Sequence, residues 1–141
     1  MSALPTGEPR VNHDTKPYWE ATAAGRIDLP VCNDCGTVVF YPRSICPDCL
    51  SESVTWRTMS GRGTIYSYTI TRAGVSSKWR EHLPLIVAYV ELEEGPRMLT
   101  NIVDTDPESV HVDMPVVAVF DPTEVESDDG GKLAIVRFTA A

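Results

Sequence analysis

The chain has 141 residues, of which 43% are hydrophobic and 23% are charged, and its formal net charge is -8 at pH 7. This length allows one ordinary domain, or a small barrel joined to a module that is too small to fold alone. The acidic balance opposes binding to a polyanion, so we expect no nucleic-acid partner. Because no apolar run approaches the roughly 20 residues that span a bilayer, we expect a cytoplasmic protein with no membrane partner.

The N-terminal part predicts an arm followed by a short helix. Residues 1–14 contain two prolines and a glycine without any apolar period, which indicates a flexible arm. Residues 15–27 favour a helix, because Thr15 suits its N-cap and Pro17 suits its first turn. Gly25 would end it.

Tyr18 and Trp19 are neighbours in this predicted helix, and two interpretations of the pair are open. The two rings can pack on the module that follows. Alternatively, an exposed Tyr-Trp pair anchors a partner protein, because aromatic residues are enriched at interface hot spots. Both residues are therefore candidate partner-binding residues.

The most informative motif is a pair of Cys-x2-Cys knuckles, Cys32 with Cys35 and Cys46 with Cys49, in a chain without other cysteines. Each pair can bind one ion from a single turn, and two facing turns predict the tetrahedral thiolate shell that zinc favours. Residues 36–45, between the knuckles, combine β-branched and aromatic side chains with a proline and predict a short hairpin.

Four cysteines allow other chemistry. Two disulfides are disfavoured because the start of the chain has neither the basic nor the apolar region of an export signal. A thioredoxin-like redox pair needs one knuckle beside a βαβ pattern, which this sequence lacks. Iron in a rubredoxin-like shell uses the same four ligands and stays open. Zinc is favoured because nothing else in the sequence indicates electron transfer.

The second half of the chain has an almost continuous β pattern. Branched and aromatic residues recur in stretches separated by turn signals, at 62–71, 85–93, 98–103, 115–120 and 133–138. Five short strands predict a closed antiparallel barrel, for which the OB-fold is the commonest five-stranded solution. We expect a mainly β chain with an arm over 1–14, a helix and rubredoxin-like zinc ribbon over 15–54, and an OB-fold barrel over 55–141.

Three segments carry a family resemblance when they follow a short aromatic helix in this order: PVCNDCGTVVFYPRSICPDCLS, GRGTIYSYTITR and LPLIVAYVELEEGPRMLTNIV. The chain resembles the zinc-ribbon and OB-fold proteins that are associated with acyl-CoA enzymes, first catalogued as a domain of unknown function numbered thirty-five. The resemblance covers about residues 15–139. Its specificity comes from the combination, since ribbons and OB barrels each occur in many proteins.

This resemblance implies a function. It implies an accessory subunit that forms a hetero-oligomer with a thiolase-fold enzyme, such as a thiolase or a retro-aldolase, and that is not an enzyme on its own. Related domains are also paired with hydratases acting on steroid side-chain CoA esters, so lipid or steroid degradation is implied. The OB module would help to hold the acyl-CoA while the partner performs the carbon-carbon chemistry. One structural zinc ion per chain is implied as the cofactor.

A basic loop in the acidic second half fits this expectation. Arg72, Lys78 and Arg80 lie within nine residues, beside Trp79. A CoA molecule presents a pyrophosphate and a ribose phosphate, which suit cations, and an adenine that can stack on an indole. We therefore take these four residues as candidate CoA-binding residues. The alternative is that the cations form salt bridges with Glu81 or with a partner.

Catalytic machinery is not recognisable in the sequence. The three histidines occur in no nucleophile motif, and the cysteines are assigned to the metal. A closed shell of four thiolates has no open position for water, which indicates a structural ion. His82 beside Glu81 is the one conceivable acid-base pair, and an exposed loop pair is the default interpretation.

Two other functional classes stay open. Ribbons and OB barrels also bind single-stranded nucleic acids through stacked aromatics, and Tyr66 and Tyr68 are candidate stacking residues; the alternative is that at least one of them lies in the core, because they are two apart and share one face. The acidic balance disfavours this class. The other alternative is a rubredoxin-like electron carrier with iron in the thiolate shell.

Overall fold

The computed structural model describes residues 4–141, and its first element is helix α1 (Lys16–Ala23). Thr15 is the N-cap residue, as predicted, but its hydroxyl does not cap the helix. It accepts from the Asn12 N–H at 3.1 Å, and the Asn12 side chain accepts from the Thr15 N–H at 3.0 Å. Gly25 has a φ of 73°, a left-handed conformation that glycine adopts without strain. The helix thus ends four residues before the predicted limit of 27.

A two-stranded antiparallel sheet supports the ribbon. It pairs β1 (Asp28–Cys32) with β2 (Val54–Thr58). The predicted hairpin within residues 36–45 is wrong, because that segment contributes a single isolated bridge to β1. Sequence analysis missed both strands. Pro30 lies within β1, where proline disfavours a strand assignment, and β2 is short and has no fully buried residue, although Val54 and Trp56 alternate with exposed neighbours.

The second half forms the predicted closed five-stranded barrel, in the order β3-β4-β5-β7-β6. Its pairs are antiparallel, except that β5 meets β7 in parallel. The strands are β3 (Arg62–Thr71), β4 (Leu85–Leu92), β5 (Arg97–Ile102), β6 (Pro115–Glu126) and β7 (Lys132–Ala140). The 3-10 helices η1 (Ser77–His82) and η2 (Pro107–Ser109) lie in two of the connections.

Most strand limits agree closely with the sequence, and β6 is the exception. It continues six residues beyond the predicted end at 120 and pairs with β7 through a register irregularity between Pro122 and Glu126. In the sequence, Asp121 followed by Pro122 is typical of the end of a strand. The register irregularity after Pro122 allows the proline to lie within β6. Glycine is required at position 63 of β3 for a steric reason, because a Cβ there would lie 2.4 Å from the Glu91 carbonyl oxygen in β4.

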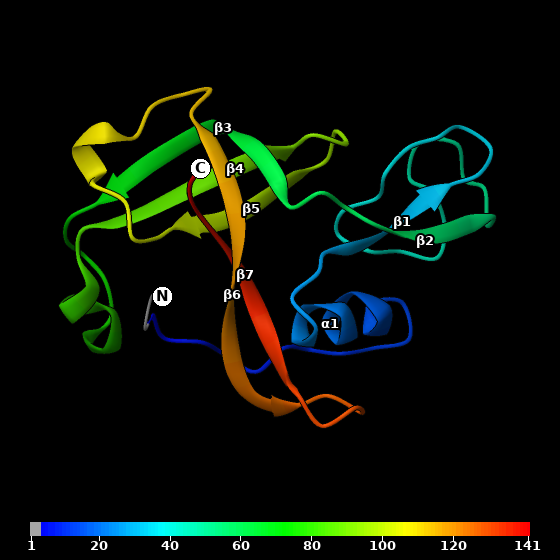
Figure 1. The fold of residues 1–141 in the computed structure, drawn as a ribbon, viewed down its shortest axis with the longest axis horizontal. Coiled ribbons are helices and arrows are strands. Elements are labelled where there is room, and N and C mark those ends of the chain that lie inside the picture. Colours follow the sequence, from blue (N-terminus) through cyan, green and yellow to red (C-terminus); the bar gives the residue numbers. More distant parts are fainter. Residues whose placement is uncertain (1–3) are drawn as a thin grey trace.

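Helix α1 lies between the ribbon and the barrel and connects them (Figure 1). One continuous hydrophobic cluster includes Trp19 from α1, Leu29 from β1 and Phe138 from β7. Thr22 adds a polar link, because its hydroxyl donates to the Trp19 carbonyl at 2.6 Å and accepts from the Ala134 N–H of β7 at 3.0 Å. The two modules therefore share a core.

The described part of the predicted arm, residues 4–14, contains no helix or strand, and residues 1–3 of that prediction lie outside the described residues. The Pro5 carbonyl accepts a hydrogen bond from Arg137 of β7 at 3.2 Å. None of the helices in residues 4–141 is long and apolar enough to cross a membrane.

The Thr22 link yields a stability prediction. Thr22→Val keeps the shape of the side chain but leaves the buried Ala134 N–H without its acceptor, so we expect a loss of about 1–3 kcal/mol in the free energy of unfolding. Urea denaturation measures this loss. The matched control is Thr69→Val on an exposed position of β3, which should change stability by less than about 0.5 kcal/mol. Equal effects of the two substitutions would contradict the proposed link.

Candidate metal centre and ligand surface

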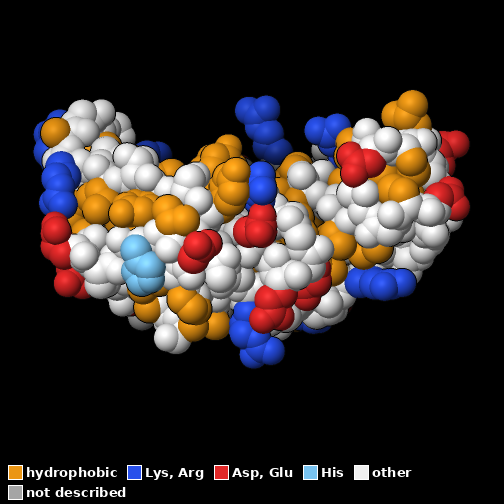
Figure 2. Space-filling view, turned by 90° about the horizontal axis from the view of Figure 1, so that it is seen from above, with side chains coloured by type: hydrophobic (Ala, Val, Ile, Leu, Met, Phe, Trp, Pro, Cys, Tyr) orange, Lys and Arg blue, Asp and Glu red, His pale blue; other side chains and the backbone are white. Residues whose placement is uncertain are grey.

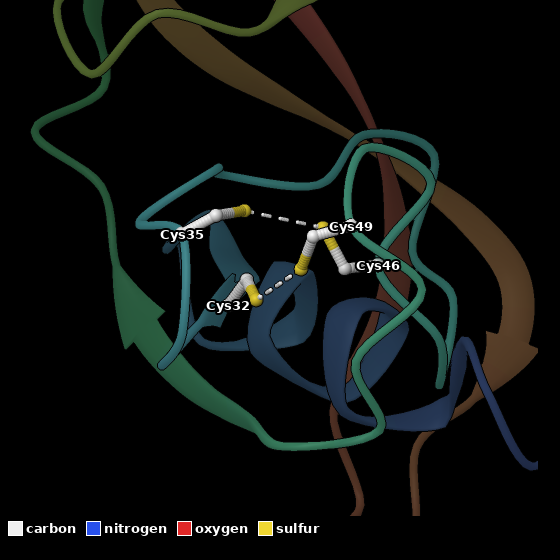
Figure 3. Close-up of side chains that lie close together, drawn as sticks. All are labelled: Cys32, Cys35, Cys46 and Cys49. Atoms are coloured by element: carbon white, nitrogen blue, oxygen red, sulfur yellow. Dashed lines mark hydrogen bonds between the residues drawn. The ribbon is translucent and has the colours of Figure 1, made fainter.

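The four cysteine sulfurs converge on one point, as predicted (Figure 3). All four Sγ atoms lie within 4.8 Å of one another. The Sγ atoms of Cys32 and Cys49 are 3.5 Å apart, and those of Cys35 and Cys46 are 3.6 Å apart. A tetrahedral ion with metal–sulfur bonds of about 2.3 Å needs sulfur atoms about 3.8 Å apart. The cluster therefore fits a single tetrahedral ion.

Each knuckle is built by the same backbone turn. The Gly36 N–H donates to the Cys32 carbonyl at 3.0 Å, and the Leu50 N–H donates to the Cys46 carbonyl at 2.9 Å. Gly36 and Leu50 both have positive φ values, 78° and 65°. Cys32 and Cys46 are buried, whereas the second cysteine of each knuckle is exposed. The shell thus has an inner side against the protein and an outer side in solvent.

Hydrogen bonding gives two of the thiols very different pKa values. Thr37 lowers the pKa of Cys35 to about 6, first through its side chain and then through its backbone. The backbone of Ser51 lowers the pKa of Cys49, but interactions with Cys32, Cys35 and Cys46, together with slight desolvation, raise this pKa to about 12. A cation that binds all four sulfurs must displace the remaining protons, so metal binding is coupled to proton release.

Tyr18 and Trp19 pack behind the metal cluster and are not an exposed pair. Tyr18 is 4% exposed, and its ring makes edge contacts with Trp19 at 5.0 Å and with Phe40 at 6.1 Å between centroids. The Trp19 indole N–H donates to the Tyr41 hydroxyl at 2.9 Å. The expectation of an exposed partner anchor is wrong, because these rings close the core between α1 and the ribbon.

The four candidate CoA-binding residues take different positions. Arg72 forms an ion pair with Glu108 of η2 at 2.9 Å, so the predicted pairing with Glu81 is replaced by another carboxylate. Lys78 and Arg80 are exposed on η1, and neither has a carboxylate partner among the described residues. Trp79, between them, turns toward the barrel and lines a cavity. Arg72 is thus paired with a carboxylate, whereas Lys78 and Arg80, on either side of Trp79 in the sequence, have no carboxylate partner among the described residues.

The barrel also presents aromatic side chains to solvent. Tyr66 and Tyr68 are both exposed, so neither takes the core position that was the alternative to a stacking role; the register shift between Ile65 and Ser67 interrupts the simple alternation of β3. The Arg97 guanidinium lies 3.7 Å from the centre of the Tyr66 ring. Figure 2 shows hydrophobic side chains gathered in a band across the barrel half of one face.

A buried polar cluster was missed by sequence analysis. Arg137 of β7 and Asp121 of β6 form an ion pair at 3.4 Å, with both side chains under 10% exposed (8% and 7%). Burial lowers the pKa of Arg137, and the hydrogen bond and charge of Asp121 oppose that effect. Arg137 also donates to the Asn101 side chain at 2.6 Å. The available signal was a charged residue directly after the apolar run 115–120 and another within the apolar run 133–138.

A zinc ribbon beside an OB-fold barrel is the class of protein that this architecture defines. Residues 19–55 match the model of the "ChsH2, rubredoxin-like zinc ribbon domain", and residues 56–121 match that of the "ChsH2, C-terminal OB-fold domain". A "DUF35 domain-containing scaffold protein" of Methanocaldococcus jannaschii is 38% identical over 100 residues, which are 70% of either chain. The chain belongs to the DUF35 family.

Similar proteins include longer chains and a solved complex. A "probable enoyl-CoA hydratase alpha subunit" of Thermomonospora curvata is 34% identical over 77% of this chain and 34% of its own length. A "3-oxo-4,17-pregnadiene-20-carboxyl-CoA hydratase alpha subunit" of Mycobacterium tuberculosis is 30% identical over 79% of this chain and 35% of its own length. A solved chain of an "Ltp2-ChsH2(DUF35) aldolase" superimposes with a TM-score of 0.75 at 30% identity, covering 94% of this chain and 98% of that chain.

The thiolate cluster yields a prediction about metal content. Cys46→Ser removes one of the two buried ligands, so we expect metal content to fall from about one ion per chain toward zero and the ribbon to unfold. Elemental analysis and tryptophan emission measure the two effects. Asp48→Asn, in the same knuckle but outside the sulfur cluster, is the matched control and should retain the metal. Full metal content in the Cys46→Ser protein would contradict a four-sulfur site.

Proposed function

We propose that this chain is a non-catalytic accessory subunit of a thiolase-fold acyl-CoA enzyme, either a thiolase or a retro-aldolase, and that it helps to hold the acyl-CoA. The observation that carries the proposal is the superposition, at a TM-score of 0.75, on nearly the whole of a DUF35 chain from a solved aldolase. Two longer relatives are named as alpha subunits of CoA-ester hydratases, and one of those names describes a steroid-derived substrate. These names support a role in lipid or steroid side-chain degradation.

The geometry of the metal cluster supports a structural ion in place of a reactive one. Four sulfurs at tetrahedral spacing satisfy the ion completely and leave no coordination position for a substrate. We propose zinc as this ion, one per chain, because thiolate shells of this kind in ribbons favour it. A colourless protein with stoichiometric zinc is expected, whereas visible absorption from bound iron would support the electron-carrier alternative.

The free cations on η1 support the contact with CoA. Lys78 and Arg80 project into solvent from a surface whose overall charge is negative, and Trp79 lies between them in the sequence. Phosphate groups of a CoA ester would gain charge-assisted hydrogen bonds there. Single-stranded nucleic acid is a weaker candidate, since Arg97 covers the ring of Tyr66 at 3.7 Å and limits stacking by a base.

The accessory role is tested by co-purification and activity. A tagged chain expressed in its native host should recover a thiolase-fold acyl-CoA enzyme, identified by mass spectrometry, in a hetero-oligomer of fixed stoichiometry. The purified chain alone should show no thiolase, aldolase or hydratase activity. Thr69→Val is a suitable control bait, because it alters only an exposed strand position. Recovery of no acyl-CoA enzyme, or activity in the isolated chain, would contradict the proposal.

The CoA contact is tested by charge reversal of Lys78 and Arg80 within the complex. Lys78→Glu/Arg80→Glu should raise KM for the acyl-CoA by about tenfold or more, because two charge-assisted contacts become repulsive. Arg72 is left intact because its reversal would also break the Glu108 pair.

The matched control for this charge reversal is Arg43→Glu/Arg57→Glu, which changes the net charge equally at exposed positions away from η1, where neither cation has an ion-pair partner among the described residues. Both variants should remain in the complex. A KM that responds equally to both variants, or to neither, would exclude a local contact at η1.

A further inference from the structure

The two knuckles repeat one six-residue pattern, Cys-x-Asp-Cys-x-(Thr or Ser), at residues 32–37 and 46–51. In both copies the N–H of the first residue donates to the carbonyl of the sixth residue at 2.9 Å. The same pattern thus folds twice into the same closed turn. The sulfur cluster explains the cysteines of each copy, and it leaves the aspartate and the hydroxyl residue without a role.

The aspartate of each knuckle accepts a hydrogen bond from the hydroxyl residue of the other knuckle. The Thr37 hydroxyl donates to the Asp48 carboxylate at 2.8 Å, and the Ser51 hydroxyl donates to the Asp34 carboxylate at 2.5 Å. The Ser51 hydroxyl also accepts from the Ser53 N–H at 3.0 Å, which directs its own hydrogen toward Asp34. These two hydrogen bonds, the inter-knuckle straps, each have an ionised acceptor and are therefore stronger than hydrogen bonds between neutral groups.

The straps lie on the solvent side of the sulfur cluster. Cys35 and Cys49 are its exposed ligands, whereas the other two cysteines are buried (Figure 3). Each strap joins the residue before one exposed cysteine to the residue two positions after the other. The exposed cysteines are the ligands that can turn outward into solvent and let the ion leave. Opening this side of the cluster breaks both straps.

The charge of the site explains why the knuckles need such links. Four thiolates around a divalent cation carry roughly two negative charges in excess. Asp34 and Asp48 add two carboxylates within the same turns, and like charges at this separation repel one another. A carboxylate that accepts from the facing knuckle converts part of this repulsion into a contact that holds the two turns together.

We propose that the two straps hold Cys35 and Cys49 on the ion and thereby slow the release of metal from the ribbon. Thr37, Ser51 and the two aspartates are then positioning residues, because they fix the turns that carry the ligands and do not bind the ion. Hydrogen-bond partners outside the coordination sphere typically change metal affinity by about 10–100-fold. Metal retention of this kind does not depend on the proposed accessory function.

The test measures the rate at which the full-length, zinc-loaded chain transfers zinc to an excess of the chromogenic chelator 4-(2-pyridylazo)resorcinol. Thr37→Val/Ser51→Ala removes both hydroxyl donors and keeps all four sulfurs. We expect this variant to bind about one zinc ion per chain before the chelator is added, and to release it at least about tenfold faster than the unmodified chain. Equal release rates would overturn the proposal.

The matched control is Thr58→Val, which removes a hydrogen bond of the same kind outside the knuckles. The Thr58 hydroxyl donates to the Asp28 carboxylate at 2.7 Å, between β2 and β1 of the same ribbon. Its zinc release rate should stay within about twofold of that of the unmodified chain. If Thr58→Val accelerates release as much as the double variant does, the ribbon responds to any loss of stability and the straps have no specific role.

A double-mutant cycle at one strap separates it from a direct effect on sulfur, because the Thr37 hydroxyl also lies 3.2 Å from the Cys35 sulfur. Thr37→Val, Asp48→Ala and the combined variant all leave the Ser51–Asp34 strap in place, so the ribbon keeps one link between its knuckles. Each should release zinc about threefold faster than the unmodified chain. The combined variant should be no faster than the single ones, because either substitution already breaks the strap. Accelerations that multiply in the combined variant would show that the two side chains act separately, and would overturn the proposal.

Discussion

The convergence of four thiolates on one point is the constraint on which the N-terminal half depends. The ribbon has only a five-residue strand pair, β1 with β2, and the loops that carry the cysteines have little regular structure. A module of this size cannot bury enough apolar surface to hold such loops without a metal or another staple. An ion held by the four sulfurs would fix both knuckles and the segment between them, whose Phe40 and Tyr41 rings contact Tyr18 of α1.

The shared core extends this order to the barrel. Helix α1 contacts both β1 and β7. At this junction the Thr22 hydroxyl donates to the Trp19 carbonyl and accepts from the Ala134 N–H. Loss of the metal would therefore disturb the helix and the face of the barrel that it covers. Helix η1 and the cavity that Trp79 lines lie at the end of the barrel away from the ribbon (Figure 1). In this arrangement the metal centre stabilises surfaces that lie away from it.

Local patterns in the sequence were sufficient for the metal ligands, for the barrel class and for four of the five barrel strands to within about two residues at each end. They failed where distant contacts decide the structure. Pro30 forms part of β1 because β2 pairs with it from beyond the second knuckle. The Tyr18-Trp19 pair is buried because the fold places Phe40 and Tyr41 around it. No spacing rule could place Arg137 against Asp121 and Asn101, since that contact depends on barrel closure.

Under the proposed function, a partner enzyme performs the chemistry and this chain supports it. The most direct measurement of that division is kcat/KM of the purified thiolase-fold partner for its acyl-CoA, with and without this chain. We expect kcat/KM to fall at least about tenfold when the chain is omitted and to recover when the metal-loaded chain is added back. An unchanged kcat/KM for the partner alone would contradict the supporting role of this chain.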